Sequence, residues 1–69
     1  MKRIAKDIDG RIAVNASAVF GYHLVDIPQE DGTVKYGVDA MLPGMAILVF
    51  ASEDAFQAKV EFERLKKAL

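Results

Sequence analysis

The sequence predicts an α+β fold, in which a small antiparallel sheet of three to four strands, in the order strand, strand, strand, helix, packs on one C-terminal helix. Three observations predict this fold. Residues 34–39 alternate apolar and polar side chains, residues 45–50 are all apolar, and residues 53–68 repeat apolar side chains at spacings of three and four. Alternation is typical of a half-buried strand, and the longer spacing is typical of an amphipathic helix. At 69 residues we expect one domain, residues 1–69.

The N-terminal residues 1–18 fit two interpretations. Residues 4–8 and 11–14 flank Asp9 and Gly10, a pair typical of a hairpin turn. This favours a short strand or strand pair. Residues 13–18 also suit a turn of helix, because alanine favours helix while valine, asparagine and serine oppose it.

The next part of the chain predicts a hairpin. Residues 19–27 are rich in β-branched and aromatic side chains, and residues 30–33 read Glu-Asp-Gly-Thr before the alternating run begins. The Asp-Gly pair allows the positive φ that a tight reversal needs, and Pro28 ends the first strand because it has no amide hydrogen.

Residues 45–50 read Met-Ala-Ile-Leu-Val-Phe and follow the chain break at Leu42, Pro43 and Gly44. Successive side chains of a strand point to opposite faces, so a strand that is apolar on both faces needs cover on both. One helix covers one face only. The rest of the chain, or a second molecule, must cover the other, which indicates a protein that works by contact.

The last element is a helix, predicted over residues 53–68. Ser52 is the expected N-cap, and the cations of the last turn suit the negative end of the helix dipole. One apolar stripe is expected to form its core face, and consists of Ala55, Ala58, Phe62, Leu65 and Leu69.

Phe56 and Val60 do not belong to this stripe. At 100° per residue they project from the far side of the helix, among charged residues. Two explanations stand. Phe56 folds back over Phe50 or Ala51 as a hydrophobic staple, or Phe56 and Val60 dock onto another chain.

Composition excludes several classes of protein. The chain has no cysteine, so it has neither a disulfide framework nor a thiolate metal site. The longest uncharged stretch, residues 40–52, falls well short of a membrane span, and charged residues interrupt any signal-peptide core. We therefore expect a cytoplasmic protein. Residues 1–11 and 55–69 each carry a net charge of +2, whereas residues 12–54 carry −5.

No catalytic, cofactor or metal signature appears. His23 is the only histidine and has no second soft ligand to share a zinc ion with it. The acids near the hairpin could do acid–base work, but solvated acids are expected at strand ends and in a turn. We expect a protein that is not an enzyme and binds no cofactor.

A nucleic-acid-binding regulator is the alternative. Aromatic rings on adjacent strands form stacking platforms in single-strand binders, and such platforms are interleaved with cations. A chain of net charge −1 lacks the electrostatic attraction that dominates such binding. The residues of this alternative are Phe20, Tyr22, Tyr36, Lys2, Arg3 and Lys6.

One family resemblance is visible along residues 20–69. It rests on Tyr22, on Glu-Asp-Gly at 30–32, on Tyr-Gly-Val at 36–38, on Leu-Pro-Gly at 42–44, and on Ser-Glu-Asp-Ala at 52–55 before a helix. In these features the chain resembles the N-terminal module of HicB-type antitoxins. The resemblance implies a truncated ribonuclease-H fold of three antiparallel strands and a helix, which binds and masks a small ribonuclease toxin. Met45 stands where the family often has cysteine, and no DNA-binding tail follows the helix in this sequence, so the resemblance implies the masking role alone.

The sequence therefore predicts a non-catalytic protein–protein interaction module. We expect a small inhibitor, antitoxin-like masker or phage anti-defence factor that self-associates as a dimer and blocks a larger protein partner, without nucleic acid or membrane. Its expected partner-binding residues are Phe56, Val60, Asp26, Glu30, Asp31 and Asp39.

Overall fold

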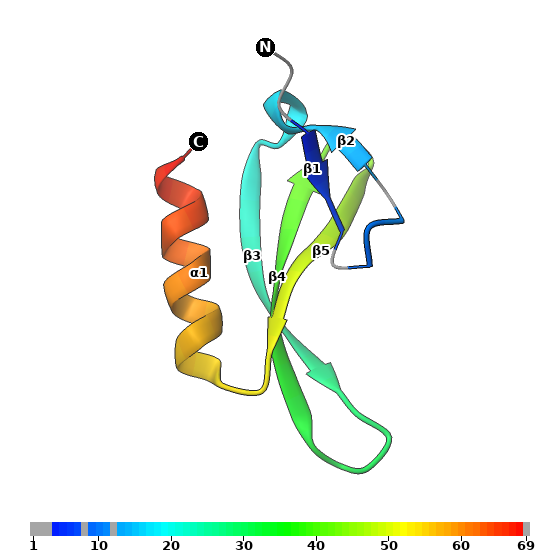
Figure 1. The fold of residues 1–69 in the computed structure, drawn as a ribbon, viewed down its shortest axis with the longest axis vertical. Helices are drawn as coiled ribbons and strands as arrows, with labels where there is room; N and C mark the ends of the chain where they lie inside the picture. Colours follow the sequence, from blue (N-terminus) through cyan, green and yellow to red (C-terminus); the bar gives the residue numbers. More distant parts are fainter. Residues whose placement is uncertain (1–3, 8, 12, 69) are drawn as a thin grey trace.

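A computed structural model describes residues 4–7, 9–11 and 13–68. Strands β3 (Gly21–Pro28), β4 (Val34–Leu42) and β5 (Met45–Ser52) form an antiparallel sheet in that order, followed by helix α1 (Ala55–Lys67). Strands β1 (Ile4–Lys6) and β2 (Ala13–Asn15) form a separate antiparallel pair (Figure 1). The predicted α+β fold, with its strand, strand, strand, helix order, is confirmed.

The predicted hairpin turn and the predicted break before β5 both lie where the sequence places them. Pro28 is the last residue of β3, and beyond it the Gln29 amide donates to the Thr33 carbonyl at 2.8 Å. Between β4 and β5, Gly44 has a φ of +77°, which residues other than glycine rarely adopt. The Pro43–Gly44 turn therefore leads the chain directly from β4 into β5.

The N-terminal segment contains both of the structures that its sequence suggests. Strands β1 and β2 pair across the turn at Asp9 and Gly10, as the strand interpretation predicts. The helical interpretation holds only for the short 3-10 helix η1 (Ala16–Ala18). The Asn15 side chain accepts a hydrogen bond from the Ser17 amide at 3.0 Å and caps it.

The core lies between the sheet and α1. In the second half of β4 every second residue is buried on this side, namely Val38, Ala40 and Leu42. Val19, which follows η1, forms one buried cluster with Ala40, Leu42 and Ile47, and Val14 of β2 packs against this cluster. The N-terminal segment thus adds to the layer that covers the helix side of the sheet.

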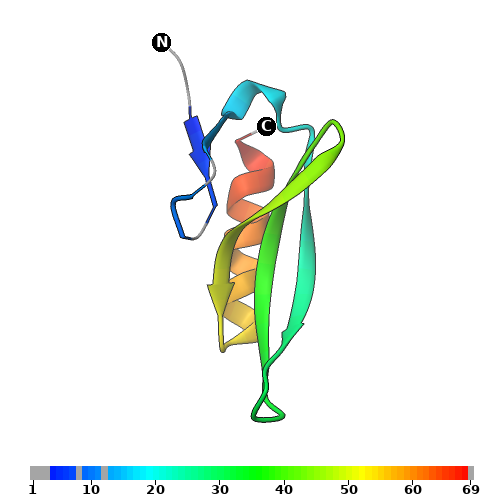
Figure 2. The ribbon, with the colours of Figure 1, turned by 90° about the vertical axis from the view of Figure 1, so that its right-hand side faces the viewer.

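The opposite side of the sheet, here named the open face, has no covering element among the described residues. Figure 2 looks onto the sheet with α1 behind it and nothing in front. Cross-strand partners share a face, so the register assigns side chains to it. The larger ones are Val25, Ile27, Lys35, Asp39, Met41 and Leu48, all half-buried, and His23, which is exposed opposite Asp39.

Strand β5 shows the result of covering one side only. Ile47 is buried on the helix side, whereas Leu48 is half-buried on the open face. Met45 and Ala46 are exposed. A register shift opposite Val38 and Asp39 leaves Val49 as an extra residue, and it packs against the helix-side core. The second cover that the sequence demands does not come from the described N-terminal residues.

Helix α1 begins two residues later than predicted, and the prediction of Ser52 as N-cap is wrong. Asp54 is the N-cap, and its side chain accepts from the Phe56 amide at 2.9 Å. The Ser52 hydroxyl instead accepts from the Asp54 amide at 3.0 Å, while Ser52 still belongs to β5. Extension of the sheet through residue 52 therefore delays the helix. The predicted basic last turn is confirmed.

The predicted core stripe of α1 is only partly buried. Ala58 is fully buried, Phe62 and Leu65 are half-buried, and Ala55 is exposed at the first turn. Leu69 lies outside the described residues. Within the described part of the chain, no helix has the length and hydropathy needed to cross a membrane.

Candidate functional site

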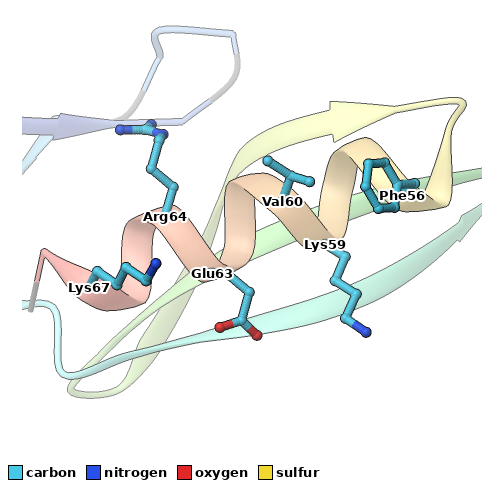
Figure 3. Close-up of a pocket in the computed structure, with 6 residues that line it drawn as sticks. All are labelled: Phe56, Lys59, Val60, Glu63, Arg64 and Lys67. Atoms are coloured by element: carbon cyan, nitrogen blue, oxygen red, sulfur yellow. The ribbon is translucent and has the colours of Figure 1, made fainter.

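Phe56 and Val60 form an exposed apolar pair on the outer side of α1. Their side chains lie one turn apart and point the same way (Figure 3). Phe56 is 68% exposed and Val60 is 47% exposed. The staple explanation is wrong, because the cap at Asp54 places Phe56 in the second helical position and leaves its ring in solvent.

The surface around this pair, named here the helix patch, is a pocket of about 430 Å³. That volume lies within the range of small-molecule sites. All of its lining residues come from one helix, however, so no second element closes it. The shape suits a protein surface better than an enclosed ligand. The lining residues are Phe56, Lys59, Val60, Glu63, Arg64 and Lys67.

Four of the charged side chains of α1 form two ion pairs within the helix. Arg64 forms two hydrogen bonds with the Glu61 carboxylate, the longer of them 3.0 Å. This contact lowers the pKa of Glu61 and raises that of Arg64. Lys66 lies 3.8 Å from Glu63, which is a weak ion pair.

The remaining cations give the helix patch a positive rim. Lys59 and Lys67 form no ion pair with any residue in the described ranges. In Figure 3 Lys59 points to the same side as Glu63, and Lys67 lies beyond Glu63 toward the C-terminal end of the helix patch. The helix patch therefore combines an apolar centre with two ammonium groups that form no ion pair with the described residues.

The predicted acidic residues do not join the helix patch. Asp26, Glu30 and Asp31 are exposed on the β3–β4 hairpin, which extends past the start of α1 in Figure 1. Asp39 lies on the open face. Asp31 has a structural role, since it accepts from the Thr33 hydroxyl at 2.6 Å and the Thr33 amide at 3.0 Å. These hydrogen bonds lower the pKa of Asp31.

The aromatic residues of the nucleic-acid alternative are divided between two environments. Tyr22 and Tyr36 are half-buried on the helix side, and Tyr22 packs against the core cluster. Phe20 is 66% exposed just before β3, and Lys6 is exposed on β1. Lys2 and Arg3 lie outside the described residues. The structure therefore does not bring these rings together as one open stacking platform.

Sequence reasoning missed the surface at the centre of the open face. Gly37 has no side chain, and the tips of Ile27 and Leu48 lie over it. A Cβ added at Gly37 would stand 2.7 Å from Leu48 Cδ1 and 2.9 Å from Ile27 Cδ1. The signal was available, because a glycine inside an alternating strand marks a close approach. Three strands are thus bridged by two apolar side chains.

Within the described ranges, no group of three or more histidines and acids is placed to hold a metal ion. Comparison with known proteins finds no match to this chain among family models, curated proteins or solved structures. Three antiparallel strands followed by a helix is the arrangement that the antitoxin resemblance implies, and β3 to α1 have this arrangement. Membership of that family stays a prediction.

Proposed function

We propose that this chain is a non-catalytic protein–protein interaction module that binds and masks a larger protein in the cytoplasm, in the manner of a small antitoxin-like or anti-defence inhibitor. The observation that carries the proposal is the exposed pair Phe56 and Val60 on the outer side of α1. Burying one phenylalanine side chain is worth about 2 kcal/mol. The Phe56 ring is 68% exposed, so most of this free energy is gained only when a partner covers the ring.

The position of the pair supports a binding role over a folding role. Ala58 anchors the opposite side of α1 in the core, so the helix is already packed without Phe56. The Asp54 cap satisfies the helix N-terminus without a staple. Phe56 and Val60 therefore contribute little to the fold, and a substitution there changes the surface and leaves the core intact.

The charges beside the pair indicate the chemistry of the partner. Lys59 and Lys67 form no ion pair with the residues that the structure describes, and both flank the apolar centre. A partner that presents an apolar side chain between carboxylates complements this surface. Rim charges of this kind mainly set the rate of association and its salt dependence.

The test compares two phenylalanines of nearly equal exposure. The intact chain serves as bait in a pull-down from its host, alongside Phe56→Asp and Phe20→Asp variants. Phe56 and Phe20 are 68% and 66% exposed, on α1 and before β3 respectively. We expect Phe56→Asp to reduce capture of the partner at least tenfold and Phe20→Asp to leave it unchanged.

The double variant with Phe56→Asp and Val60→Lys should abolish capture while circular dichroism shows unchanged helix content. Equal loss in the Phe20→Asp variant would assign binding to the N-terminal side of the sheet. Full capture by the double variant would show that the helix patch is not the binding surface.

A further inference from the structure

The open face is a second apolar surface, separate from the helix patch. Its three strands, at about 4.8 Å spacing and about 3.4 Å per residue, span roughly 400 Å². We propose that a second copy of this chain covers the open face, sheet against sheet, about a two-fold axis that lies between the two sheets and passes over Gly37 of β4.

The charges of β4 favour a second copy as the occupant. Lys35 and Asp39 lie on the open face, two residues to either side of Gly37, or about 7 Å from it along the strand. Neither residue forms an ion pair in the part of the chain that the structure describes. They are too far apart along one strand to pair with each other.

A two-fold axis that passes over Gly37, in the plane of the interface midway between the two sheets and perpendicular to β4, makes the two central strands antiparallel. Lys35 of one copy then lies opposite Asp39 of the second copy, and the same contact recurs on the other side of the axis. A surface that complements itself under rotation is the requirement for a symmetric dimer. The open face meets this requirement, because Lys35 and Asp39 carry opposite charges.

The centre of the face is shaped for close contact between two sheets. Over Gly37 the side chains of Ile27 and Leu48 converge from the two neighbouring strands. They form an apolar strip across β4, at the point where the axis would pass. Facing sheets pack about 10 Å apart with such side chains interdigitated.

The size of the face sets the strength of the dimer. Two faces of roughly 400 Å² place the contact below about 1,200 Å² in total, at the weak end of specific interfaces. We therefore expect self-association at micromolar concentration. The contact does not involve the helix patch, so it is independent of the proposed masking function.

Sedimentation velocity across a range of 5 to about 500 μM tests the proposal with a charge swap. The full chain is expected to form a dimer. Lys35→Glu places a carboxylate opposite Asp39 of the second copy, and Asp39→Lys places two ammonium groups together, so each variant alone should dimerise at least tenfold more weakly. An equimolar mixture of the two variants restores both opposite-charge contacts and should restore dimerisation.

Two further variants decide the assignment. Ala46→Lys adds a charge at an exposed position of the open face and should also prevent dimerisation, with circular dichroism reporting the fold. The helix-patch variant Phe56→Asp should dimerise as the parent chain does. A parent chain that stays monomeric throughout, or a mixture of variants that does not recover, would overturn the proposal, whatever the pull-down experiment shows.

Discussion

Gly37 matters to the packing of the sheet because it has no side chain. Glycine inside a strand weakens a sheet, since it has no side chain to pack and loses more conformational entropy on folding. Here that cost is offset by two neighbours, Ile27 and Leu48, which lie across the strand in the space that a Cβ would fill. The residue thus links the packing within one sheet to the shape of the surface that the sheet presents.

Gly37→Ala is therefore expected to destabilise the fold by about 1–2 kcal/mol, the usual cost of adding a methyl group to a filled site. The Ile27 and Leu48 tips can rotate away, but the new Cβ would also stand 3.0 Å from the Phe50 carbonyl oxygen, which belongs to the backbone. Urea unfolding followed by circular dichroism measures the change in free energy of unfolding.

Gly21→Ala is the matched control for this substitution. A Cβ at Gly21 meets nothing within 4 Å. Its free energy of unfolding should stay unchanged or rise by up to about 1 kcal/mol, because alanine restricts the unfolded chain. Equal destabilisation in both variants would mean that the crowding above Gly37 is not the cause.

At the scale of the element, α1 has two sides with separate tasks. Ala58 is fully buried against the sheet, whereas Phe56 and Val60 face outward, and the Asp54 cap sets where this division begins. The Glu61–Arg64 contact connects two turns of the helix at its surface. Pairs at this spacing support a helix most at low salt.

The Glu61–Arg64 contact predicts a pH dependence of stability. The Arg64 hydrogen bonds hold the pKa of Glu61 below its ordinary value of 4.5 in the folded chain. The unfolded chain therefore binds more protons, so the stabilising effect is present above pH 4.5 and is lost as the pH falls through the lowered folded pKa.

Glu61→Gln should consequently show a small loss of stability at pH 7 that shrinks toward zero as the pH falls below 4. Thermal unfolding of the two proteins at several pH values measures this difference. In the Glu61→Gln background, the further substitution Arg64→Gln should change stability equally at every pH. A change in stability that still varied with pH in that background would not come from the Glu61–Arg64 contact.

At the scale of the whole molecule, the N-terminal segment and α1 share one face of the sheet and leave the other uncovered. Val19 is only 7% exposed and packs with Ala40 and Leu42. The segment before β3 therefore forms part of the core, although its own strands, β1 and β2, are only three residues long. In a chain of 69 residues, each such contact is a large share of a small core.

Val19→Ala should accordingly lower the free energy of unfolding by about 2 kcal/mol, through lost burial and the cavity that remains. Val34→Ala removes the same atoms at a position that is 39% exposed, on the β3–β4 hairpin, and should change stability by less than about 0.5 kcal/mol. Chemical denaturation of both variants at one protein concentration gives the comparison. Equal effects would place Val19 outside the core.

The sequence by itself determined the elements and their order, because the signals for them are local. Each signal depends on residues that are close together in the chain. These signals are the alternation along β4, the apolar run of β5, the turn residues around Gly32 and Gly44, and the cations at the end of α1. Local signals also placed Phe56 and Val60 outside the core stripe of the helix. They did not determine where the helix begins, since that depends on how far β5 stays paired with β4.

Only the tertiary structure decided which face of the sheet is covered. A strand that is apolar on both sides demands two covers, and its sequence does not say which part of the chain supplies each one. Val14 and Val19 joined α1 on the same side, a choice made by contacts between residues far apart in the chain. Lys35 and Asp39 thereby came to lie on an uncovered surface, because the register of a sheet places distant residues on one face together.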